Sequence, residues 1–223
     1  MRNSLLVVAL LLALPVIASA QDEVPKVEIF GGYSYLRADN ATGLSSQQTS
    51  AATGTSTTTA STITTAPLDR DLNGFEVSVT NNLNGLLGIE ASFSGHFTNA
   101  QVNGSTLDRN IYFVTVGPRL TLRRFEKFTP FLHIMAGMAR QDVSNQQNQT
   151  TAAALGLVNQ SDTGLAFVAG GGVDFNLNER FALRLFQTDY ILTRFSNRNG
   201  ASSQLNQANF RASTGLVVRF GEQ

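Results

Sequence analysis

The side chains best suited to acid–base chemistry near neutral pH are two histidines, His96 and His133. Histidine-based hydrolases and acyltransferases pair the imidazole with Ser and with Asp or Glu. His96 comes near Asp108 only across an expected loop. His133 is expected in the middle of a strand, near Thr115 or Met135 rather than near a carboxylate. Neither histidine forms a triad by spacing, so we expect no catalytic residue and no enzymatic activity.

Metal and cofactor chemistry has little support in the sequence. The two histidines are far apart, and the chain has no cysteine, which excludes disulfides and a thiolate metal site. We therefore expect no cofactor and no bound metal. We interpret His133 as a hydrogen-bonded side chain inside the fold.

Charged residues that recur inside apolar stretches form the second group of interest. Each alternates with apolar neighbours, so a strand would place the charges on one face and the Val, Leu, Ile and Phe side chains on the other. Acids and bases are balanced, and buried charges must be paired and hydrogen-bonded. We predict a salt-bridge network that contains Glu28, Glu76, Glu90, Arg119, Asp174, Arg184, Arg211 and Arg219.

The last stretch, 209–220, shows the underlying alternation most clearly. Phe210, Leu216 and Phe220 fall on one face, whereas Arg211 and Arg219 fall on the other. A period of two predicts a β-strand. The stretch is also about as long as a tilted strand needs to be to cross a bilayer.

Seven earlier stretches show the same alternation and predict seven further strands, at 26–36, 72–80, 86–97, 109–122, 129–140, 163–177 and 181–194. In the last of these, Gln187 and Asp189 share a face with Phe181 and Leu185, which breaks the pattern. A β-bulge shifts the phase by one residue. We predict a bulge near 187–188 that turns Asp189 to the charged face.

The connections between these strands alternate in length. Short turns are expected at 81–85, 123–128 and 178–180, and long polar loops at 37–71, 98–108, 141–162 and 195–207. An even number of strands, with short turns on one side and long loops on the other, is typical of an outer-membrane barrel. The predicted fold is all-β, an eight-stranded antiparallel up-and-down transmembrane β-barrel closed by pairing of the first and last strands.

The N-terminus has the pattern of a secretory signal peptide. Arg2 precedes the apolar run 5–14, and Ala18-Ser19-Ala20 follows as a cleavage site, so we expect residues 1–20 to be removed and 21–223 to form one barrel domain. No later stretch is long and apolar enough for a transmembrane helix. Without Arg2 the chain has 15 basic and 16 acidic residues, which gives no reason to expect a nucleic-acid partner.

Four features of the chain resemble a known family of proteins. They are the opening strand Val27-Glu28-Ile29-Phe30-Gly31-Gly32-Tyr33-Ser34-Tyr35, the stretch Ala169-Gly170-Gly171-Gly172-Val173-Asp174, the pattern Arg184…Asp189-Tyr190 and the aromatic Phe220. It is the group of small eight-stranded outer-membrane barrels of the OmpA transmembrane domain and OmpX type, the outer membrane protein β-barrel domain. The resemblance covers the whole mature chain. It implies residence in the outer membrane of a Gram-negative-type cell and recognition of the C-terminal strand by the barrel-assembly machinery.

The expected function is that of a monomeric, non-enzymatic scaffold in outer-membrane lipids. An eight-stranded barrel is just wide enough for its own side chains to fill, so the charge network is expected to plug the lumen. Loops carry function on rigid scaffolds, which makes 37–71 and 141–162 candidates for extracellular surface contact. One alternative is a narrow porin-like channel for ions or small solutes. Another is a soluble, lipocalin-like ligand-binding barrel with its apolar faces inward.

Overall fold

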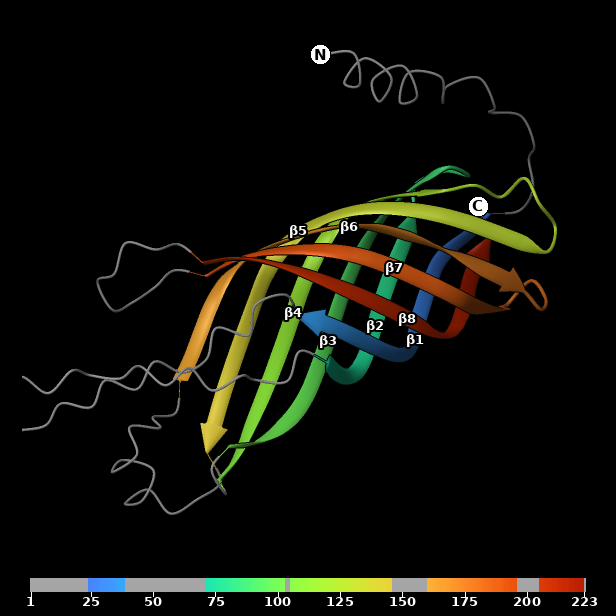
Figure 1. Cartoon of the computed structure of the whole chain (residues 1–223). Coiled ribbons are helices and arrows are strands. Elements are labelled where there is room, and N and C mark those ends of the chain that lie inside the picture. The colour runs from blue at the N-terminus through green and yellow to red at the C-terminus, as the bar shows by residue number, and fades with distance from the viewer. Residues whose placement is uncertain (1–23, 39–70, 103–104, 146–159, 196–204, 223) are drawn as a thin grey trace, which may run out of the picture.

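The computed structural model describes residues 24–38, 71–102, 105–145, 160–195 and 205–222. These residues form eight antiparallel strands that close into one barrel, with β8 paired to β1 (Figure 1). The predicted fold class is confirmed. In chain order the strands are β1 (Pro25–Ala38), β2 (Asp71–Asn82), β3 (Leu87–Val102), β4 (Ser105–Thr121), β5 (Phe128–Asn145), β6 (Gln160–Asn176), β7 (Phe181–Phe195) and β8 (Leu205–Glu222).

The alternation sorts side chains between the outside and the inside of the barrel. Along β5, Ile134 on the outside is 68% exposed, whereas the neighbouring His133 is 2% exposed. The predicted transmembrane orientation, apolar outward and charged inward, holds on every strand that supplies a charge of the network. A soluble lipocalin-like barrel would require the reverse arrangement, so the structure contradicts that alternative. No described helix has the length and hydrophobicity needed to cross a membrane.

The irregularity predicted in the seventh strand is present, but it lies earlier than expected. Arg184 pairs with Gly215 whereas Gln187 pairs with Ser213, so the extra residue lies between Arg184 and Gln187. Leu185 and Phe186 both point outward. Gln187 therefore faces inward together with Asp189, where it bonds to other buried polar groups. The bulge lets Gln187 form hydrogen bonds inside the barrel. The alternation of apolar residues carries no information about such bonds, so it did not give the position of the bulge.

The strands extend further toward the long connections than the sequence pattern predicted. β3 and β4 stay paired as far as Val102 and Ser105, so the predicted loop 98–108 is mostly a β-hairpin. β5 continues to Asn145 and β6 begins at Gln160, which shortens the predicted loop 141–162. Polar residues can form the backbone hydrogen bonds between strands as well as apolar residues can. The strand ends predicted from polarity alone were therefore wrong. The predicted signal peptide and most of the loop 37–71 lie outside the described residues.

Asparagine side chains shape two of the short turns. Asn84 Oδ1 accepts hydrogen bonds from the backbone N–H groups of Leu86 and Leu87. Asn178 Oδ1 accepts equivalent bonds from Arg180 and Phe181. Such local bonds replace ladder bonds where the chain reverses direction. They hold the strand ends in place on the side of the barrel where both described termini lie.

Candidate functional site

The interior of the barrel contains the charged residues singled out in the sequence. All eight are at most 7% exposed, and each takes part in at least one ion pair or hydrogen bond. They divide into two groups along the barrel. One group surrounds Arg119 on the side of the short turns, and the other surrounds Arg211 nearer the middle.

Arg119 on β4 is the centre of the first group. Its Nη2 lies 3.2 Å from Asp174 Oδ2 and 3.6 Å from Glu28 Oε2, and its Nη1 lies 3.8 Å from Glu90 Oε2. Arg184 completes the group from β7, with Nε 2.8 Å from Asp174 Oδ1. Two cations and three carboxylates from five different strands therefore meet in a region shielded from solvent, where their attraction is only weakly screened.

Glu28 links this group to the rim on the short-turn side. Arg123, in the turn after β4, places Nη2 2.6 Å from Glu28 Oε1. Arg219 on β8 lies at the outer limit of an ion pair, 3.9 Å from the same oxygen, and donates a hydrogen bond of 2.8 Å to Asn176 Oδ1. The role of Arg123 was missed, because a charged turn residue is ordinarily expected to face water.

Arg211 on β8 is the centre of the second group. Its Nη2 lies 2.6 Å from Asp189 Oδ2 and 3.0 Å from Glu76 Oε1. Its Nη1 donates to Ser94 Oγ at 2.9 Å. Glu76 also accepts a bond of 2.6 Å from Ser213 Oγ, so both sides of the pair have additional hydrogen bonds. Such bonds are what a buried ion pair needs to offset its desolvation.

His133 joins the two groups, which corrects the sequence-based placement. Its Nδ1 lies 3.0 Å from Glu90 Oε2 and its Nε2 lies 2.8 Å from Asp189 Oδ1. It was expected near Thr115 or Met135 rather than near a carboxylate. Those two residues instead contact each other, with 3.7 Å between Oγ1 and Sδ.

Asp189 reaches His133 because the residue between them, Gly170, has no side chain. The two residues lie on β7 and β5, and Gly170 on the intervening β6 pairs with both of them. A Cβ atom at Gly170 would lie 2.1 Å from Asp189 Oδ1, so any larger residue would fill the space that the carboxylate occupies. Gly170 is thus a requirement of the charge network.

Aromatic rings separate the guanidinium groups of the first cluster. The Cζ atoms of Arg119 and Arg184 lie 3.9 Å and 4.3 Å from the centroid of the Phe131 ring, and Arg184 also lies 4.1 Å from the Phe30 centroid. A desolvated cation over a ring gains on the order of 2 kcal/mol. Sequence reasoning missed these rings because Phe30 and Phe131 look like ordinary apolar strand residues.

A buried apolar cluster lies on the long-connection side of the charges and was also not predicted. On each contributing strand, its members follow the charged positions toward the long connections. All of them are at most 2% exposed. Its members are Leu36, Ala38, Leu72, Ile111, Phe113, Met135, Ala139, Ala166, Val168 and Ile191. Buried polar residues such as Arg109, Thr193 and Asn209 lie on the same side, so the interior there is mixed, with an apolar cluster that the charged half lacks.

The second histidine lies at the boundary between these two regions. His96 Nε2 is 2.9 Å from Ser34 Oγ, and its ring packs edge-on against Phe113. A nucleophilic serine would need a third group to orient the histidine. No described carboxylate bonds to His96 Nδ1, and the imidazole is fully buried. Among the described residues, no carboxylate orients this pair as in a catalytic triad.

Comparison with known proteins agrees with this architecture. The family described as outer membrane protein beta-barrel domain matches residues 6–220. Neisserial surface protein A has a similar structure, with a TM-score of 0.56 and 12% identity over 87% of this chain and 97% of that one. Ail, the attachment invasion locus protein of Yersinia pestis, crystallised with the heparin analogue sucrose octasulfate, has a TM-score of 0.53 and 18% identity over the same shares. No curated protein sequence matches the chain.

At these identities the two structures establish similarity of fold alone. The family match covers nearly the whole chain and agrees with the closed barrel and its apolar outer wall. The protein therefore belongs to the outer membrane protein β-barrel domain family, the small eight-stranded barrels of the outer membrane.

Proposed function

We propose that this protein is a non-enzymatic outer-membrane scaffold whose lumen is closed to ions and solutes. The observation that carries the proposal is the filling of the interior by two successive regions of different chemistry. One region is the ion-pair network around Arg119, His133 and Arg211, and the other is the apolar cluster around Phe113 and Met135.

The charged region opposes conduction because its groups are already paired. An ion entering the lumen would have to displace Arg119 or Arg211 from carboxylates that each contacts at 3.2 Å or less. Removing one member of a buried pair costs about 3–5 kcal/mol. A conducting constriction needs charges that exchange their partners for the passing ion, whereas these charges are held from several strands at once.

The apolar region opposes conduction for a separate reason. Side chains such as Ile111, Phe113 and Met135 offer no hydrogen bond to a water molecule or to an ion's hydration shell. Each is at most 2% exposed, so these side chains have almost no contact with solvent. This second barrier favours the closed scaffold over the narrow channel, which is the competing proposal.

Hydroxyl-radical footprinting in phospholipid bilayers tests the proposal, because oxidation of methionine by this reagent needs adjacent water. We expect Met135, which is 1% exposed inside the lumen, to be oxidised only after unfolding. Met138 on the lipid-facing side of the same strand serves as an internal reference. Rapid oxidation of Met135 in the folded protein, with Met138 protected, would support the channel instead.

We propose that β8, which ends near Phe220, is recognised by the barrel-assembly machinery, and that the barrel is monomeric.

We also propose that the long connections 37–71 and 141–162 provide extracellular surface contacts. The run 41–66 contains ten Thr, five Ser and no charged residue, so it lacks the basic groups that a sulfated ligand like the one bound to Ail would need. Binding of labelled protein to cell surfaces, with and without 41–66, tests the contact role.

A further inference from the structure

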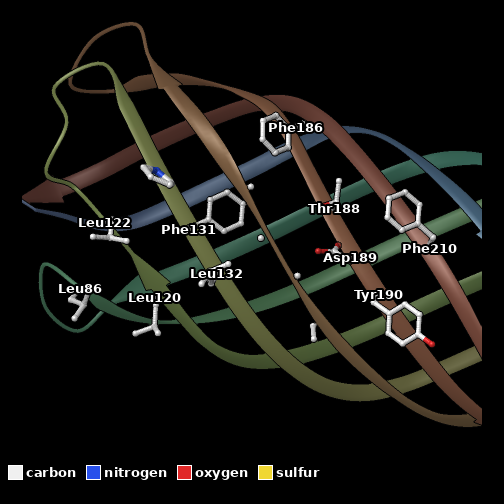
Figure 2. A pocket seen from close by; sticks show the side chains of 15 residues that line it. Leu86, Leu120, Leu122, Phe131, Leu132, Phe186, Thr188, Asp189, Tyr190 and Phe210 are labelled. Atoms are coloured by element: carbon white, nitrogen blue, oxygen red, sulfur yellow. The ribbon is translucent and has the colours of Figure 1, made fainter. Parts of the chain in front are cut away.

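The outer wall of the barrel has a hollow of about 810 Å³ that crosses β4 to β8 (Figure 2). Leu86, Leu120 and Leu122 lie at one end, near the short turns, and Tyr190 and Phe210 lie at the other. Most of its lining residues, among them Leu132, Phe186 and Tyr190, are exposed on the outside of the barrel. The hollow is therefore a groove within a surface that faces lipid.

The groove exists because β6 has small outward residues. Gly171 pairs with Leu132 on β5 and with Thr188 on β7, and the next outward residue, Ala169, pairs with Tyr190. Larger neighbours thus stand on both sides of a floor formed by the stretch 170–172, through which the hollow also reaches Phe131 and Asp189. Such a floor leaves contacts unmade unless another apolar group fills it.

The dimensions and surroundings match a lipid chain. Four inter-strand spacings of about 4.8 Å separate β4 from β8, so the groove is roughly 19 Å long. Half of the hydrocarbon core of a bilayer is about 15 Å thick. In outer-membrane barrels the short turns face the periplasm, so a chain in this groove would belong to a lipid of the periplasmic leaflet.

Cationic side chains lie where the headgroup of such a lipid would be. Leu122 and Pro130 line the groove and close the turn between β4 and β5 through a backbone bond of 2.9 Å. The exposed turn residues Arg124 and Lys127 pair with no other described side chain, whereas Arg123 is turned inward to Glu28. Glu126, also exposed, is the one acid in this turn, which leaves an excess of positive charge.

We propose that this groove binds one acyl chain of an anionic glycerophospholipid of the periplasmic leaflet, with the phosphate held by Arg124 and Lys127. Each basic residue near an anionic headgroup favours binding by about 1 kcal/mol. The acyl chain supplies the apolar contacts along Leu132 and Tyr190. The site requires both parts, because the wall alone would not distinguish headgroups.

Native mass spectrometry of the full-length mature protein tests this with phosphatidylglycerol and phosphatidylcholine that have identical chains. We expect one phosphatidylglycerol to be retained roughly thirtyfold better than phosphatidylcholine, as two basic residues at about 1 kcal/mol each imply. The double variant Arg124→Gln/Lys127→Gln should abolish that preference. Its control is Lys26→Gln on β1, an exposed charge at the same end of the barrel but on the opposite side.

The chain-binding part is tested by filling the groove. Ala169→Phe should lower retention of both lipids, whereas Ala136→Phe, an exposed lipid-facing position outside the groove, should not. Equal retention of the two lipids by the wild type, or unchanged retention in Ala169→Phe, would overturn the proposal. It would also be overturned by a dimer that Ala169→Phe disrupts, because a second copy would then be the occupant of the groove.

Discussion

Replacing Arg184 with Met should destabilise the folded barrel strongly, because Arg184 is fully buried and bonded on several sides. The substitution removes the 2.8 Å pair with Asp174 and the 2.7 Å hydrogen bond to Gln187. It keeps a flexible apolar side chain against Phe30 and Phe131. The variant therefore tests the charge separately from the packing.

The expected loss follows from what each partner retains. Breaking a buried pair costs about 3–5 kcal/mol, but Asp174 keeps Arg119 Nη2 at 3.2 Å, so a value near the lower limit of about 3 kcal/mol is expected. Each 1.4 kcal/mol is a factor of ten, so the unfolded fraction should rise roughly a hundredfold. The double variant Arg184→Met/Asp174→Asn should lose less than the sum of the two single changes.

Urea titration in phospholipid bilayers measures this loss, with the folded fraction read from heat-dependent mobility on gels. Arg140→Met is the matched control, since Arg140 is 59% exposed and its 3.1 Å pair with Asp142 lies on the surface. That change should cost less than about 1 kcal/mol. A loss for Arg184→Met as small as the control, or additive effects in the double variant, would refute the idea of a paired interior network.

Two further substitutions test the link between the charge clusters. Gly170→Ala should cost about 1–3 kcal/mol, because its Cβ would lie 2.1 Å from Asp189 Oδ1 and 2.4 Å from the backbone oxygen of Thr188, whereas Gly31→Ala, with nothing within 4 Å, should be close to neutral in the same titration. His133→Ala should cost on the order of 3 kcal/mol, since it leaves Glu90 and Asp189 without the group between them, and His133→Gln should recover part of that loss. Equal stability of the two His133 variants would contradict the bridging role.

The sequence was sufficient for the barrel and for which charged residues point inward, because both depend on a period of two. Glu28, Arg119 and Arg219 alternate with apolar neighbours, and their inward placement follows from that pattern alone. Partner choice does not follow from it. His133 meets Asp189 because of the β5–β6–β7 register and the absent side chain of Gly170, which no single strand encodes.

The apolar part of the interior escaped prediction for a different reason. Ile111, Tyr112, Phe113 and Val114 are four apolar residues in succession, so the strand has no polar face there to identify the inside. The same ambiguity hid Phe30 and Phe131 as ring partners of the arginines. Where both faces of a strand are apolar, only the assembled barrel decides which one faces lipid.

Conductance in planar lipid bilayers tests the central claim, the closed lumen, most directly. Purified wild-type protein should insert, as its heat-dependent mobility will report, and yet produce no current steps above the bare bilayer. Shortening the apolar cluster with Phe113→Ala/Met135→Ala should also leave the bilayer silent, because the network around Arg119 and Arg211 still fills the remaining length. Reproducible single-channel steps from the wild-type barrel would contradict the account and identify the protein as a narrow channel.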